Sequence, residues 1–190
     1  MLGLQRGTIR IVPADPTWAV AFAEEEARLR ASLGQLAVDI QHVGSTSVPG
    51  LDAKPVIDIA MAVASFDDIA RCRSGLLALG YLDLGDDGRD GGYLFVKESH
   101  PEVRTHHLHI VTGDDPQWAN YLRFRDRLRK DDGLRDEYGA LKRELQDPYA
   151  CNRRGYTAAK EPFIRRVLRG QPPRLLTPPQ APPRHREDRA

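Results

Sequence analysis

One segment of the sequence combines a turn of small hydroxyl residues with a solitary acid. In "HVGSTSVPGLDAKPVIDIAMAV", residues 42–63, Gly44 and Ser45 precede Asp58 by thirteen to fourteen positions. A glycine and a serine in a tight turn after a strand can present backbone N–H groups and a hydroxyl to phosphate oxygens. No Gly-Lys-Ser/Thr triplet follows Gly44 at Walker A spacing, and the dinucleotide-binding fingerprint is missing from the sequence. We therefore predict a local phosphate-binding turn that includes Thr46.

Asp58 interrupts an apolar strand. Side chains alternate along a strand, so Ile57, Ile59 and Met61 share one face and Asp58 lies on the other. An ionised carboxylate in such a strand is costly unless it is paired, hydrogen-bonded or bound to a cation, which favours a functional site. The alternative is an acid near the exposed end of the strand that pairs with Lys54.

Two histidines two positions apart fall in a second predicted strand, "RTHHLHIV". His107 and His109 then point to one face, and His106 points to the other. With Asp58, the pair could form a metal site of two histidines and one carboxylate, or one histidine could act as a general base on an acceptor hydroxyl. His42, next to the turn, could join either arrangement. The alternative is that these histidines only cover the sheet and hydrogen-bond to neighbours.

Each of the three last predicted helices carries a cation on its apolar side. Arg125, Lys142 and Lys160 all fall within stripes of apolar residues at helical spacing. Together they could form a pocket for phosphate or carboxylate, in which arginine gives bidentate contacts and lysine gives a point charge. Alternatively, each side chain extends to solvent and pairs with an acid such as Asp126 or Glu161.

The periodic pattern predicts a mixed α/β (α+β) fold in which helices flank a mixed sheet and a helical part follows at the C-terminal end. A polar stretch, 83–92, is predicted as a mobile loop, and Pro-rich residues 171–190 as a disordered or extended tail after one domain, 1–170. Helices are predicted at 15–33, 65–80, 116–130, 133–146 and 158–169, the last behind a Thr157 cap, and strands at 38–43, 55–63, 93–98 and 104–111.

The composition limits the possible partners. Lys and Arg, 28 in number, nearly balance 27 Asp and Glu, so the chain has no general attraction for nucleic acid or for an anionic membrane. The sequence has no apolar stretch of signal-peptide or bilayer length, and its cysteines are Cys72 and Cys151. A reduced cytoplasmic protein is the expectation.

The segment "HVGSTSVPGLDAKPVIDI", followed in order by "HHLH", "FRDRLR", "YGALKREL" and "YTAAKEPFI", resembles the GrpB family over residues 8–169. That family is assigned to the nucleotidyltransferase fold of the DNA polymerase beta superfamily. The resemblance implies that Gly44 and Ser45 hold a triphosphate and that Asp58 binds magnesium or manganese. However, Ala60 stands where a second acid is expected, and His107 and His109 stand nearest to the third, which suits zinc or another transition metal better.

Two functional hypotheses follow from the residues and the resemblance. The first is a metal-dependent nucleotidyltransferase that uses a nucleoside triphosphate, or another phosphorylated small molecule, and an unidentified small acceptor. Asp58, His107 and His109 would be catalytic, and the turn would bind substrate together with His42, Lys54, Arg125, Lys142 and Lys160. The second is a non-catalytic module that binds a nucleotide or another anion and has lost two-metal chemistry. Assistance to a partner enzyme, suggested by domain fusions among relatives, is a third possibility.

Overall fold

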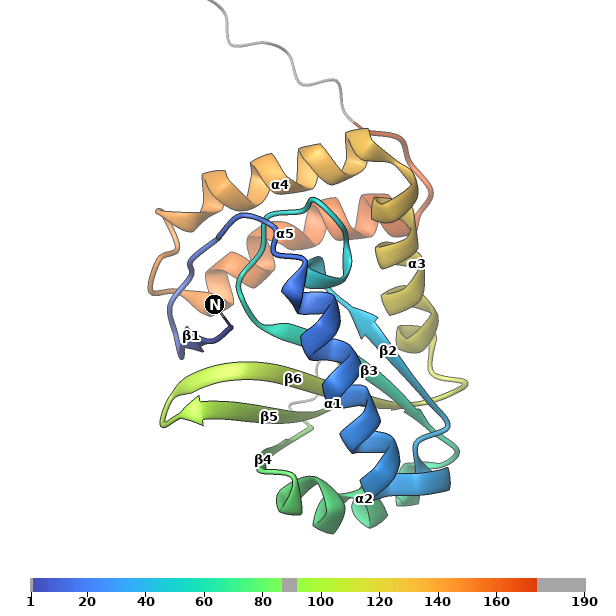
Figure 1. The fold of residues 1–190 in the computed structure, drawn as a ribbon. Coiled ribbons are helices and arrows are strands. Elements are labelled where there is room, and N and C mark those ends of the chain that lie inside the picture. Colours follow the sequence, from blue (N-terminus) through green and yellow to red (C-terminus); the bar gives the residue numbers. More distant parts are fainter. Residues whose placement is uncertain (1, 87–91, 174–190) are drawn as a thin grey trace, which may run out of the picture.

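The protein is built on one mixed sheet, and the computed structural model describes residues 2–86 and 92–173. The strands run in the order β2-β3-β6-β5-β4, and the short β1 pairs with the start of β6 (Figure 1). β3 and β6 are parallel, and the other neighbours are antiparallel. The bounds are β1 Leu4–Gln5, β2 Asp39–Val43, β3 Ile57–Val63, β4 Tyr81–Gly85, β5 Tyr93–His100 and β6 Val103–Thr112. The predicted class, a mixed sheet flanked by helices, is confirmed.

Helices lie on both sides of this sheet. α1 (Thr17–Leu33) and α2 (Phe66–Ala78) cover one face, while α3 (Pro116–Lys130), α4 (Asp132–Gln146) and α5 (Arg153–Leu168) gather at the other side (Figure 1). Two short 3-10 turns, Gly34–Leu36 and Ser45–Ser47, flank β2. In the described part of the chain, no helix combines the length and apolarity that crossing a bilayer requires.

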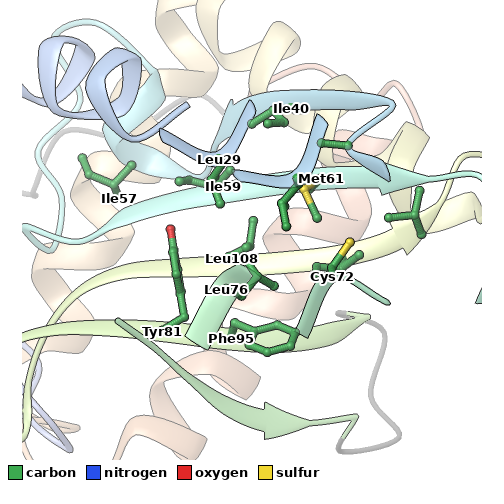
Figure 2. Packing of buried hydrophobic residues seen from close by; sticks show 14 of the residues in the cluster. Leu29, Ile40, Ile57, Ile59, Met61, Cys72, Leu76, Tyr81, Phe95 and Leu108 are labelled. Atoms are coloured by element: carbon green, nitrogen blue, oxygen red, sulfur yellow. The ribbon is translucent and has the colours of Figure 1, made fainter. Parts of the chain in front are cut away.

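The main core lies between the sheet and the first two helices. Ile57, Ile59 and Met61 of β3 are fully buried there, next to Leu29 of α1 and Leu76 of α2 (Figure 2). Burying a side chain of this size contributes about 1.5–3 kcal/mol, so the alternation in β3 is strongly specified. The predicted faces of β3 are confirmed, and Asp58 projects from the opposite face.

A second core joins the C-terminal helices to the turn after β2. The rings of Tyr138 and Phe163 stack with centroids 4.8 Å apart, and Phe124 meets Tyr138 edge-on at 5.3 Å. Val48 and Leu51, which follow the turn, are buried in the same cluster. The predicted helical part is thus confirmed, and its packing fixes α3, α4 and α5 beside residues 44–51.

Helix caps explain where the described helices begin. Asp115 accepts a hydrogen bond from the Gln117 backbone at 2.8 Å and starts α3 as predicted. α5 begins at Arg153, five residues before the predicted start, because the Asn152 side chain accepts from the Gly155 backbone at 2.9 Å. The prediction of a Thr157 cap is therefore wrong, since Asn152 is the residue that caps this helix.

Two strands and part of one predicted loop also differ from expectation. β1 and β4 were absent from the predicted elements, and β4 occupies residues 81–85, where the predicted loop 83–92 begins. β4 was missed because its last residues, Asp83 to Gly85, begin the glycine- and acid-rich stretch that predicted a loop. Residues 87–91 of that loop and the predicted tail from 174 onward lie outside the described residues.

Candidate functional site

A cleft of about 880 Å³ opens over the face of the sheet that carries Asp58. The turn after β2, strands β3 and β6, and helices α3, α4 and α5 all contribute to its walls. The structure therefore brings together most of the residues predicted from the sequence, namely Gly44, Ser45, Thr46, Lys54, Asp58, His107, His109, Lys142 and Lys160.

The turn and the acid lie in direct contact. Gly44 has a φ of 65°, and a Cβ added there would lie 2.4 Å from Asp58 Oδ2. Only glycine combines this backbone conformation with so close an approach. The Ser47 hydroxyl donates to the Gly44 carbonyl at 2.7 Å, which closes the turn.

Asp58 is paired with His107. Asp58 Oδ1 lies 2.9 Å from His107 Nδ1. Burial by itself would raise the pKa of Asp58, but the hydrogen bond from His107 and the charge of Lys54 outweigh burial and hold the pKa well below its usual range. Burial lowers the pKa of His107 to about 4, against the opposing effect of Asp58. At pH 7 the pair is thus a carboxylate and a neutral imidazole, whose proton is on Nδ1 because an ionised carboxylate only accepts.

The fit of these residues to a metal centre is poor in this arrangement. The rings of His107 and His109 are 6.4 Å apart between centroids, and Asp58 already accepts from His107. Ala60, which pairs with His109 in the sheet, gives no oxygen ligand. Within residues 2–86 and 92–173, no three His, Cys, Asp or Glu side chains are grouped as metal ligands. The residues do not fit a two-magnesium centre, and metal binding by Asp58, His107 and His109 stays a prediction.

One wall of the cleft is formed by cations, Lys54, Lys142, Arg153 and Lys160, which we call the cation wall. Lys142 is 2% exposed, donates to the Asp52 carbonyl and lies 4.8 Å from the Tyr138 ring centroid. Lys160 lies 4.4 Å from the centroid of Tyr156. No ion pair joins the cation wall to a carboxylate of the described chain.

The pKa values of these lysines reflect that environment. Burial, followed by the charge of Lys160, lowers the pKa of Lys142 to about 7. Burial, followed by the charge of Lys54, lowers the pKa of Lys160 to about 7. Burial also lowers the pKa of Lys54, although Asp58 opposes this shift. The cation wall consequently has too little negative charge nearby to balance its positive charge.

The structure places two of the predicted substrate-binding residues outside the cleft. His42 pairs with Ile59, shares the face of the main core and stacks on Phe22 at 4.7 Å. Arg125 donates to the Gln41 side chain at 2.8 Å and to the His42 carbonyl at 3.1 Å. As corrections, His42 supports the turn through a 3.0 Å contact with Thr46, and Arg125 supports the end of β2.

Several residues of the cleft were missed as site residues. Arg153 was missed because the last helix was predicted to begin after it. Tyr156 lay in a motif of the family resemblance, and Tyr121 lay on the apolar stripe of the helix 116–130, so their helical spacing was the available signal. Arg129, also missed, donates to the Ser47 carbonyl at 3.0 and 2.7 Å and holds the turn from outside the cleft.

Comparisons with known proteins agree over almost the whole described chain. The model of the family described as "GrpB protein" matches residues 8–170. The glutamate-rich protein GrpB of Alkalihalophilus pseudofirmus is 33% identical over 171 residues, which are 88% of this chain and 98% of that protein. A UPF0157 protein of Pseudomonas aeruginosa is 38% identical over 162 residues, 84% of this chain and 66% of that protein.

A solved structure gives the same result in three dimensions. The crystal structure of the conserved protein GrpB from Enterococcus faecalis matches with a TM-score of 0.77 and 31% identity, over 85% of this chain and 96% of that chain. The family match from residue 8 to residue 170 includes the turn, Asp58, the histidine strand and the cation wall. The chain belongs to the GrpB protein family.

Proposed function

We propose that the protein binds a phosphorylated small molecule, the class that includes nucleoside triphosphates, in the cleft. The phosphates lie between the Gly44–Ser45 turn and the cation wall. The observation that supports this most strongly is that the cation wall lines a cleft and forms no ion pair within the described chain. Lys142 is buried and the other three cations are half-buried; cations partly removed from water without an anion are costly, and a bound phosphate reduces that cost.

The lysines favour a ligand with more than one negative charge. Burial is the main reason why Lys142 and Lys160 each have a pKa of about 7; the charge of Lys160 adds to the shift of Lys142, and the charges of Lys54 and Arg153 add to that of Lys160, which Asp58 opposes. A phosphate group placed among them stabilises the protonated lysines, and Arg153 can contact two of its oxygens at once. A polyphosphate would neutralise the cation wall better than a single carboxylate would.

Nucleotidyl transfer is a second candidate, and the contact between Gly44 and Asp58 favours it. The family resemblance implies that such a turn and acid hold a nucleotide and a divalent metal side by side. A magnesium or manganese ion, or zinc given the neighbouring histidines, would supply Lewis-acid stabilisation of the phosphate charge. Asp58, His107 and His109 are its predicted ligands, although the arrangement in which Asp58 accepts from His107 fits a metal centre poorly. The predicted metal ligands are fewer than a two-metal centre requires. Binding of the ligand without turnover therefore needs fewer additional groups than nucleotidyl transfer does.

Ligand-dependent thermal stabilisation tests the binding proposal. Tripolyphosphate, the four ribonucleoside triphosphates and ribose 5-phosphate would be added to the wild-type protein, to Lys160→Met and to Lys130→Met. Lys130 lies at the exposed end of α3, outside the cleft, and is the matched control. A ligand at 100 times its Kd should stabilise the wild type and Lys130→Met by about 2.7 kcal/mol. Lys160→Met should lose most of this stabilisation, and equal stabilisation of both variants would contradict the proposal.

A second assay separates binding from transfer. Pyrophosphate release would be followed with each triphosphate and with magnesium, manganese or zinc, in the wild type and in Asp58→Asn. Release that requires the metal and disappears in Asp58→Asn would support nucleotidyl transfer. Saturable binding without release would support the non-catalytic module.

A further inference from the structure

The cleft has a second wall of different chemistry, opposite in character to the cation wall. It is formed by side chains of α3 and by one histidine of β6, and it carries aromatic rings and carboxamides. We call it the aromatic-amide wall and define it by Gln117, Asn120, Tyr121, Phe124 and His109. On α3 these residues recur at helical spacing, so they share the face of the helix that borders the cleft.

The cations of α3 do not reach this wall. Arg125 is bound to the His42 carbonyl at 3.1 Å, and Arg129 is bound to the Ser47 carbonyl at 2.7 Å. Four acids of the described chain line the cleft, namely Asp58, Asp86, Asp115 and Glu161. Asp115 caps α3, and Glu161 pairs with Arg165. The described α3 side of the cleft therefore has an acid at its start and offers no cation to a phosphate group, unlike the cation wall. A ligand that fills both sides must have a part that is not anionic.

The rings of the aromatic-amide wall form a surface on which a flat group can stack. The centroids of His109 and Tyr121 are 5.5 Å apart, and the rings are tilted by 45°. A ring inserted between two others needs a separation of about 7 Å, twice the van der Waals spacing of about 3.5 Å. The pair is thus too close to enclose a ring, and a planar ligand would stack on the side that faces the cleft.

The carboxamides next to this surface match the polar edge of a heterocycle. Gln117 and Asn120 line the cleft beside the Tyr121 ring. Asn120 Nδ2 contacts Gln117 Oε1 at 3.5 Å, a long contact that is weak and easily exchanged for one with a ligand. An amide offers a donor and an acceptor side by side, the pattern that Asn and Gln use to contact adenine.

We propose that the aromatic-amide wall is a nucleobase subsite, so that the ligand of the cleft is a nucleotide and not a sugar phosphate or an inorganic polyphosphate. The base stacks on Tyr121 and His109, Asn120 contacts its polar edge, and the phosphates extend to the cation wall. This inference rests on the proposed function, because it assumes that the cation wall holds the phosphates.

Calorimetric titration of tripolyphosphate and of ATP, GTP, CTP and UTP tests the subsite, with the wild type and the variants Tyr121→Leu, Tyr121→Phe and Asn120→Ala. Stacking on an aromatic ring contributes about 1–3 kcal/mol per base, a factor of roughly 5 to 150 in Kd. We expect the preferred nucleotide to bind at least fivefold tighter than tripolyphosphate. Tyr121→Leu should abolish this preference, while Tyr121→Phe, which keeps the ring, should retain it. Circular dichroism checks that each variant is folded.

Asn120→Ala provides a second test, because this substitution leaves the Tyr121 ring intact. It should reduce the difference in affinity among the bases and leave tripolyphosphate binding unchanged. The subsite is refuted if tripolyphosphate binds as tightly as every nucleotide, or if Tyr121→Leu and Tyr121→Phe weaken binding equally. It is also refuted if Asn120→Ala weakens nucleotide and tripolyphosphate alike. If tripolyphosphate and nucleotides all fail to bind, or if Lys160→Met changes neither affinity, the proposed function itself fails.

Discussion

The Asp58 carboxylate lies against the backbone of Gly44, so the turn and the acid form one structural unit. A Cβ at Gly44 would be 2.4 Å from Asp58 Oδ2 and 2.8 Å from Asp58 Cβ. The other carboxylate oxygen is bound by His107 at 2.9 Å. Any displacement of the turn therefore moves Asp58, and with it the hydrogen bond to the histidine strand.

Gly44→Ala should disrupt this unit, and Gly50→Ala is its matched control. Both glycines have a positive φ, of 65° and 75°, but a Cβ at Gly50 would meet nothing within 4 Å. Backbone strain alone should cost about 1–2 kcal/mol in each variant, and the clash with Asp58 adds to the cost only in Gly44→Ala. Urea unfolding gives both values, and ligand titration should show a loss of affinity for Gly44→Ala alone. Equal costs in the two variants would show that the contact is not restrictive.

Lys142 should make the stability of the protein depend on pH. Its pKa is about 7 in the folded protein and 10.5 ordinarily, because burial disfavours the charge. Between these values the unfolded chain holds a proton that the folded chain has released, so the free energy of unfolding rises with pH by up to about 1.4 kcal/mol per pH unit. The depressed pKa thus costs stability in full below pH 7, and the cost is relieved as the pH rises toward 10.5.

Lys142→Met removes that dependence. The difference in the free energy of unfolding between Lys142→Met and the wild type should favour the variant most near pH 6. This difference should decline steadily to pH 9. Lys142→Met also loses the hydrogen bond to the Asp52 carbonyl, which lowers its free energy of unfolding by about 1 kcal/mol at every pH. Urea unfolding at intervals of one pH unit measures the difference, with Lys130→Met as the exposed control. A difference that does not vary with pH would contradict the buried environment of Lys142.

Affinity for a phosphorylated ligand should decrease as the pH rises from 7 to 9. Lys142 and Lys160 lose their protons in this range, and with them the charge that attracts phosphate. The decrease should approach about tenfold per pH unit for each lysine that must be protonated. Lys160→Arg should flatten the profile, because a guanidinium stays charged at these pH values. Calorimetric titration with tripolyphosphate measures both profiles, and an unchanged affinity in the wild type would argue against a role for these lysines.

Arg129 should influence binding without contacting the ligand. Its guanidinium donates twice to the Ser47 carbonyl and does not line the cleft. Arg129→Ala should accelerate hydrogen exchange at the backbone amides of the turn and weaken ligand binding several-fold, since about 1–2 kcal/mol of hydrogen bonding is lost. Arg127→Ala, which loses a contact with the Gln171 carbonyl, is the control. Unchanged exchange at Ser47 and Val48 in Arg129→Ala would show that the turn does not depend on this residue.

Alternation along strands predicted much of the site. It placed Asp58, His107 and His109 on one face and Ile57 and Ile59 on the other, as the structure has them. These patterns are local, so they can be obtained from the sequence. The same rule applied to β2 would have placed His42 on the side of Ile40, within the core.

Contacts between residues far apart in the sequence could not be predicted from local patterns. The helical stripe predicted that Arg125 points inward, and its side chain is indeed 11% exposed. It pairs with the neighbouring Asp126 at 2.7 Å, the predicted alternative, but its other acceptors are 83 and 84 residues away in the sequence. The start of α5 was missed because Gly155 in its first turn is a poor helix former, and the Asn152 cap compensates for it. Arg153, which completes the cation wall, was lost with that turn.

The position of the phosphate groups in a co-crystal with a nucleoside triphosphate analogue tests the central claim most directly. The cation wall predicts phosphate oxygens within hydrogen-bond distance, about 2.7–3.2 Å, of Lys160 Nζ and the Arg153 guanidinium, with the Gly44–Ser45 turn on their other side. Phosphates bound elsewhere on the protein, or an empty cleft at a saturating concentration of the analogue, would contradict it.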